Sequence, residues 1–140
     1  GTIMELIELP GGRFNIVLRG RARVRLEELT FEPPFRRARA TILSTEKVRV
    51  ADGDLAALHH AAGAFTGLIK RRNPDFSLTL PKNAEPEVIA DSLAHQLVLH
   101  AHTRQAILEA VDPRERVRLV TETLTIQFAT LSGFDQNASN

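Results

Sequence analysis

Residues 103–131 read TRQAILEAVDPRERVRLVTETLTIQFATL, and this stretch decides much of the fold. The pair Asp112-Pro113 predicts the start of a long helix. An aspartate before the first turn accepts hydrogen bonds from its unpaired backbone N–H groups, and proline fits the first helical position. Apolar residues then follow at steps of three and four, namely Val117, Val120, Leu124, Phe128 and Leu131. This spacing gives the helix one apolar face, and a shorter helix is expected to end just before Asp112.

The rest of the chain divides into a strand-like first part and a helical second part. Strands are expected over residues 2–9, 13–18, 21–29 and 36–43, with a turn at residues 10–12, and helices over residues 52–72 and 86–99. The predicted fold class is α+β, with an antiparallel β lobe over residues 1–50 and a helical lobe of about four helices over residues 51–140. Charge agrees, because residues 1–50 carry ten Lys/Arg against six Asp/Glu, whereas residues 51–140 carry eight against eleven.

Composition limits the class of protein. A chain of 140 residues with 43% apolar residues is able to bury a core. No apolar run approaches the roughly 18–20 residues that a membrane helix requires, and no signal peptide pattern opens the sequence. The sequence has no cysteine, which excludes disulfides and thiol chemistry and is consistent with a cytoplasmic location.

Sequence motifs of catalysis are absent. The chain has no G-x-x-x-x-G-K-[ST] phosphate loop, no G-x-S-x-G elbow and no H-E-x-x-H pair. His59 and His60 are adjacent, so on a helix their side chains diverge by about 100°, and His95 and His100 are five positions apart. We therefore expect no catalytic residue, no cofactor and no metal in this chain.

Arginines supply the first candidate binding surface, a possible anion-binding face. Its members are Arg19, Arg21, Arg23, Arg25, Arg37 and Arg39. The first four alternate with other residues, and a strand would place all four on one face, which the last two would extend if the next strand pairs with it. Such a face suits RNA or acidic protein segments. The favoured alternative is a solvated outer face of the sheet, neutralised by Glu5, Glu8, Glu27 and Glu28.

A turn between the third and fourth strands supplies the second candidate, a possible polypeptide-binding patch. It contains Phe31, Pro33, Pro34 and Phe35. If these side chains are exposed, they form an apolar patch suited to extended, unfolded polypeptide. The alternative, which we favour, is burial, in which the turn attaches the sheet to the helical lobe.

Six short stretches follow one another in a recognisable order. They are GTI at 1–3, LPGGR at 9–13, LRGRARV at 18–24, FTGLIK at 65–70, IADSLAH at 89–95 and RQAILEAVDPRERV at 104–117. The series resembles the amino-terminal, substrate-recognition domain of Lon ATP-dependent proteases. In that family the last two stretches take the forms (L/I)-A-D-x-(L/I)-A-x-H and (K/T)-Q-x-(I/V)-L-E-x-x-D-x-x-E-R-(L/V).

The resemblance implies both a fold and a function. The β lobe is expected to be part of a small barrel of the pseudouridine-synthase-associated (PUA-like) type, whose first strands this sequence lacks. The family continues into ATPase and serine-lysine protease modules. The chain is then expected to be a non-catalytic domain of a bacterial, cytoplasmic protease, which captures unfolded or damaged proteins and helps a hexamer to assemble.

A different class of function stays open. A stand-alone PUA-like module could bind RNA or another acidic ligand through the arginines, which is an analogy at the level of the fold. A natural polypeptide that continues past residue 140 into a coiled helix and a phosphate loop favours the protease, and a natural stop there favours the stand-alone module. No membrane partner is expected in either case.

Overall fold

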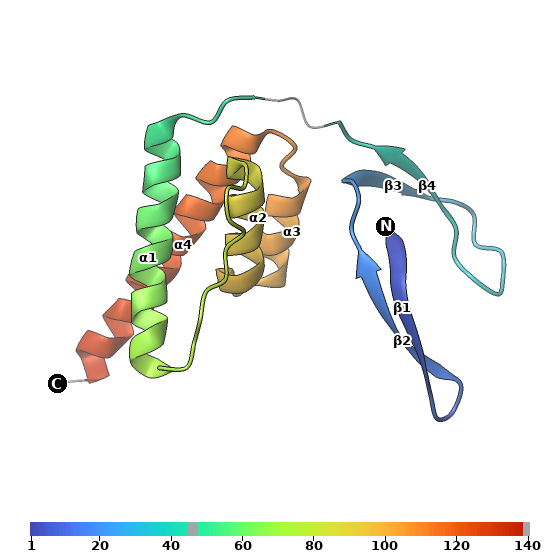
Figure 1. The fold of residues 1–140 in the computed structure, drawn as a ribbon, viewed down its shortest axis with the longest axis horizontal. Coiled ribbons are helices and arrows are strands. Elements are labelled where there is room, and N and C mark those ends of the chain that lie inside the picture. The colour runs from blue at the N-terminus through green and yellow to red at the C-terminus, as the bar shows by residue number, and fades with distance from the viewer. Residues whose placement is uncertain (45–47, 139–140) are drawn as a thin grey trace. The chain divides into compact units, whose positions relative to one another are not determined.

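The computed structural model describes residues 1–44 and 48–138, the last five of these by their backbone alone, and confirms the predicted α+β class (Figure 1). The chain divides into two compact units, a strand unit, Gly1–Ser44, and a helical unit, Thr45–Asn140. A domain boundary between residues 50 and 51 stays a prediction, because compactness does not show that either unit folds by itself.

Strands β1 (Thr2–Leu9) and β2 (Arg13–Arg19) form the predicted antiparallel hairpin. The turn between them depends on Gly11 and Gly12, whose φ angles of 83° and 70° are readily adopted only by a residue without a Cβ. The register shifts between Ile3 and Glu5, which places a β-bulge in β1.

Strands β3 (Val24–Glu28) and β4 (Ala38–Ile42) form a second antiparallel pair. β3 begins three residues later than predicted. Val24 pairs with Ile42, the last residue of β4, so the partner strand ends where β3 begins. One further bond, from the Leu43 N–H to the Arg23 carbonyl at 2.9 Å, closes this end. The described strands form two separate two-stranded sheets.

Four helices form the helical unit: α1 (Asp52–Arg72), α2 (Pro86–Leu97), α3 (Ala101–Glu109) and α4 (Pro113–Ala138). Asp112 caps α4 as predicted, because its Oδ1 accepts a hydrogen bond from the Arg114 N–H at 2.8 Å. The Arg114 side chain also donates to this carboxylate, and these bonds lower the pKa of Asp112 below its ordinary value. No described helix combines the length and the apolar character that crossing a membrane requires.

The core lies among α1, α2 and α4. Its fully buried side chains include Leu58 and Phe65 of α1, Leu93 of α2, and Val120 and Leu124 of α4. The predicted apolar face of α4 is confirmed, since Val117 is also fully buried and Phe128 and Leu131 pack against the core. Burial of this face, more than helix propensity, stabilises a helix of this kind.

Two buried polar side chains of α4 hold the neighbouring chain in place. Arg116 is 2% exposed, and its guanidinium donates to the Ala110 carbonyl at 2.9 and 3.1 Å and to the Val111 carbonyl at 3.3 Å. Its Nη1 also lies 3.4 Å from a carboxylate oxygen of Asp91. These bonds satisfy carbonyls that the end of α3 would otherwise leave unpaired.

Gln127 holds the connection between α2 and α3 in place through hydrogen bonds to its backbone. Its Nε2 donates to the Leu97 carbonyl at 2.9 Å, and its Oε1 accepts a hydrogen bond from the Leu99 N–H at 3.0 Å. One side-chain amide thus pairs with the two backbone groups that flank the extended residue Val98, as a neighbouring strand would.

Candidate functional site

The turn between β3 and β4 presents its aromatic side chains to solvent. Phe31 is 58% exposed and Phe35 is 64% exposed, and Pro33 and Pro34 between them are exposed as well. Burial, which we favoured from the sequence, is not observed. The two rings therefore have the accessibility that a polypeptide-binding patch requires, although binding at this turn stays a prediction.

Backbone and ionic contacts give this turn a defined shape. Glu32 and Phe35 form an isolated antiparallel bridge, and the Leu29 N–H donates to the Arg37 carbonyl at 2.9 Å. The Arg37 guanidinium binds the Glu32 carboxylate across the same turn. The phenyl rings are thus carried on a closed loop, which reduces the conformational entropy that a partner must remove on binding.

The arginines do not share one strand. Arg19 is the last residue of β2 and Arg25 lies in β3, whereas Arg21 and Arg23 lie in the connection between them. The four arginines therefore do not lie on one strand, as the predicted single row assumed. The reason is the start of β3 at Val24, three residues later than predicted.

A smaller face with two arginines remains on the second sheet. Arg25 pairs with Thr41 and Arg39 pairs with Glu27, and residues opposite each other, or two apart on one strand, share a face. Arg25 and Arg39 therefore lie on one face, which is the extension that we expected from strand pairing. Arg37 precedes β4 and binds Glu32.

A carboxylate accompanies this face, because Glu27 lies directly opposite Arg39. On the other face of the same sheet, Arg36 forms an ion pair with Glu28 at 3.2 Å. These groups are exposed, so each ion pair contributes at most about 1 kcal/mol and is screened by salt. The arrangement favours the solvated, partly neutralised face over a concentrated anion site, and anion binding stays a prediction.

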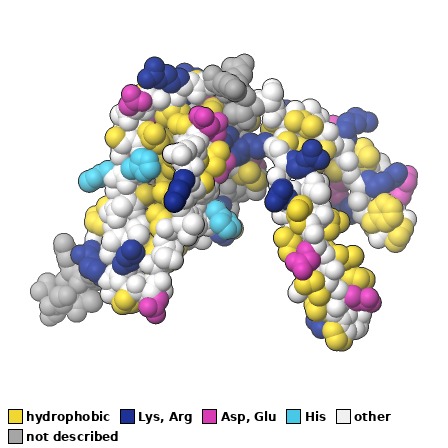
Figure 2. Space-filling model, viewed as in Figure 1, with side chains coloured by type: hydrophobic (Ala, Val, Ile, Leu, Met, Phe, Trp, Pro, Cys, Tyr) yellow, Lys and Arg dark blue, Asp and Glu magenta, His cyan; other side chains and the backbone are white. Residues whose placement is uncertain are grey.

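A third surface was not identified from the sequence. On one side of the β1–β2 hairpin five large apolar side chains are each 49–61% exposed: Ile3, Leu6, Phe14, Ile16 and Leu18. We call this set the hairpin face, and Figure 2 shows the hydrophobic side chains gathered along the hairpin. The alternation at Phe14, Ile16 and Leu18 was a usable signal, because period two marks one face of a strand.

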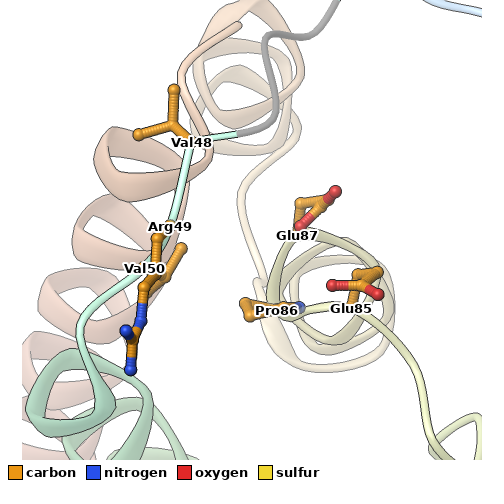
Figure 3. A pocket seen from close by; sticks show the side chains of 6 residues that line it. All are labelled: Val48, Arg49, Val50, Glu85, Pro86 and Glu87. Atoms are coloured by element: carbon orange, nitrogen blue, oxygen red, sulfur yellow. The ribbon is translucent and has the colours of Figure 1, made fainter.

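A hollow of about 500 Å³ lies within the helical unit, at the start of α2 (Figure 3). Its lining residues are Val48, Arg49, Val50, Glu85, Pro86 and Glu87. Its ionisable side chains are the carboxylates of Glu85 and Glu87 and the guanidinium of Arg49, and no histidine, serine or lysine stands beside them among the described lining residues. Among the side chains that the structure describes, those of residues 1–44 and 48–133, no group of three or more His, Cys, Asp or Glu is arranged to hold a metal ion.

Comparison with known proteins gives one consistent result. A family model described as the ATP-dependent protease La (LON) substrate-binding domain matches residues 1–125. The chain is 28% identical to a Lon protease of Heliobacterium modesticaldum over 131 residues, which are 92% of this chain and 16% of that protein. It is 30% identical to a Lon protease of Roseiflexus castenholzii over 125 residues, which are 84% of this chain and 15% of that protein. The chain thus spans 15–16% of the length of these curated relatives.

Proposed function

The chain belongs to the family of substrate-binding domains of ATP-dependent Lon proteases, and we propose from this that it captures unfolded or damaged proteins for degradation. The observation that carries the proposal is the family match over residues 1–125. Cleavage of the captured protein and hydrolysis of ATP then belong to modules of the parent protein outside this sequence. The chain itself contributes binding and no catalysis.

We propose the turn at Phe31, Pro33, Pro34 and Phe35 as a point of contact with the captured polypeptide. Two exposed phenyl rings on a closed loop support this assignment. An unfolded protein differs from a folded one by its exposed apolar side chains, and an apolar patch on a polar surface selects for that difference.

The strength of one such contact sets the mechanism. Complete burial of a phenylalanine contributes roughly 1.5–3 kcal/mol, so two rings that are already partly covered contribute about 2–4 kcal/mol together. A dissociation constant of 1 mM requires about 4.1 kcal/mol, so one turn binds only weakly. Capture therefore depends on several copies that act together, and a hexameric ring of the parent protein provides them by raising the effective concentration of the second contact.

We propose further that the parent protein acts in the cytoplasm of a bacterium. The curated relatives are bacterial Lon proteases, and a chain without cysteine is compatible with a reducing compartment. A cytoplasmic ATP-dependent protease also has direct access to damaged cytoplasmic proteins.

Fluorescence anisotropy with a labelled unfolded casein tests the proposal. We expect the unaltered chain to bind casein at both about 50 and about 200 mM salt, because apolar contacts are not screened. The double variant Phe31→Ala/Phe35→Ala removes the contribution of about 2–4 kcal/mol from the two rings and should bind roughly 30-fold to 1,000-fold more weakly. Phe14→Ala is the matched control, because Phe14 is 53% exposed but lies on the hairpin face.

The outcomes separate the function from the site. Absence of casein binding by the unaltered chain even at millimolar concentration, where a contact of about 4 kcal/mol is half saturated, would count against the capture function. Binding that Phe14→Ala weakens and Phe31→Ala/Phe35→Ala leaves unchanged would move the site to the hairpin face. Equal losses in both variants would indicate an unselective apolar surface.

A second candidate function is nucleic-acid or acidic-ligand binding through Arg25 and Arg39, which share a face of the second sheet. A short single-stranded RNA in the same experiment tests it. Binding through arginine–phosphate contacts falls steeply between about 50 and 200 mM salt. RNA binding that follows this salt dependence and is lost in Arg25→Ser/Arg39→Ser would favour a stand-alone binding module.

A further inference from the structure

We draw no further inference here: the strongest candidate, the exposed apolar hairpin face of β1 and β2, carries no proposal, because nothing in the structure shows what covers it.

Discussion

Leu124 in the helical unit is completely buried, whereas Leu6 in the strand unit keeps 61% of its surface exposed. The same contrast holds for the two units as wholes. The helical unit encloses a continuous core among α1, α2 and α4, but no described residue of Gly1–Ser44 is buried. Isolated two-stranded hairpins are at best marginally stable in water, so the strand unit depends on further cover. The stability of this chain therefore resides in its helices.

The pair Leu124→Ala and Leu6→Ala tests this contrast directly and has the largest expected effect. Removal of the buried side chain should lower the free energy of unfolding by about 2–5 kcal/mol, through lost burial and the cavity left behind. Removal of the exposed one should change it by at most about 0.5 kcal/mol. Urea unfolding followed by circular dichroism at 222 nm measures both. Similar losses in the two variants would mean that Leu6 is buried in solution, and the contrast would fail.

Arg116→Met is expected to have the next largest effect. Methionine fills part of the volume but leaves the Ala110 and Val111 carbonyls without their buried donor, which should cost about 2–3 kcal/mol. Arg118→Met is the matched control on the same helix, because the Arg118 side chain is 58% exposed and pairs only with Glu122 among the bonds described. If both variants unfold at the same urea concentration, the end of α3 does not depend on Arg116.

Asp112→Ala should destabilise the helical unit less than Arg116→Met, and in a pH-dependent way. The pKa of Asp112 is lowered in the folded state, chiefly by the hydrogen bond from the Arg114 side chain. Its contribution is complete above the unfolded-state pKa of about 4 and is lost as the pH falls through the lower folded-state pKa. At pH 7 the urea unfolding curves of wild type and Asp112→Ala should therefore differ, and at pH 2–3 they should converge. If the difference in free energy of unfolding between wild type and Asp112→Ala stays the same across this pH range, the effect comes from the cap hydrogen bond and not from the charge. Asp112→Asn is the matched control, because it keeps an acceptor oxygen but has no charge to titrate.

Gly67→Ala has the smallest expected effect, and it stabilises. Gly67 lies inside α1 on the exposed side, and an added Cβ meets no atom within 4 Å. Alanine should raise the free energy of unfolding by about 0.5–1 kcal/mol, because it restricts the unfolded chain and favours the helix.

Gly11→Ala provides the opposite case in the strand unit, since φ at this position is 83°. It should loosen the hairpin, seen as faster amide exchange in β1 and β2, and leave the helical transition unchanged.

Elements with strong local signals were predictable from the sequence. The Asp112-Pro113 cap and the apolar spacing beyond it placed α4, and the Pro10-Gly11-Gly12 turn placed the first hairpin. These signals work because the hydrogen bonds and dihedral angles that they describe involve residues a few positions apart.

Features that depend on distant residues were not predictable in this way. The start of β3 depends on its pairing with β4, which lies more than ten residues away in the sequence, and the arginine run only partly enters the strand to which it was assigned. The exposure of Phe31 and Phe35 depends on which surfaces meet in three dimensions. Arg116 and Gln127 did leave a signal, because they lie three or four positions from Val120 and Leu124 and so interrupt the apolar face of α4 with polar groups.

The two buried polar side chains of α4 also have a mechanical consequence. Arg116 and Gln127 are eleven positions apart on a helix of 26 residues, so they attach α4 to its neighbours at two points about 16 Å apart along its axis. Slippage of α4 by one turn, about 5.4 Å, would break the hydrogen bonds at both points together. A load applied along α4 is therefore shared between the end of α3 and the end of α2.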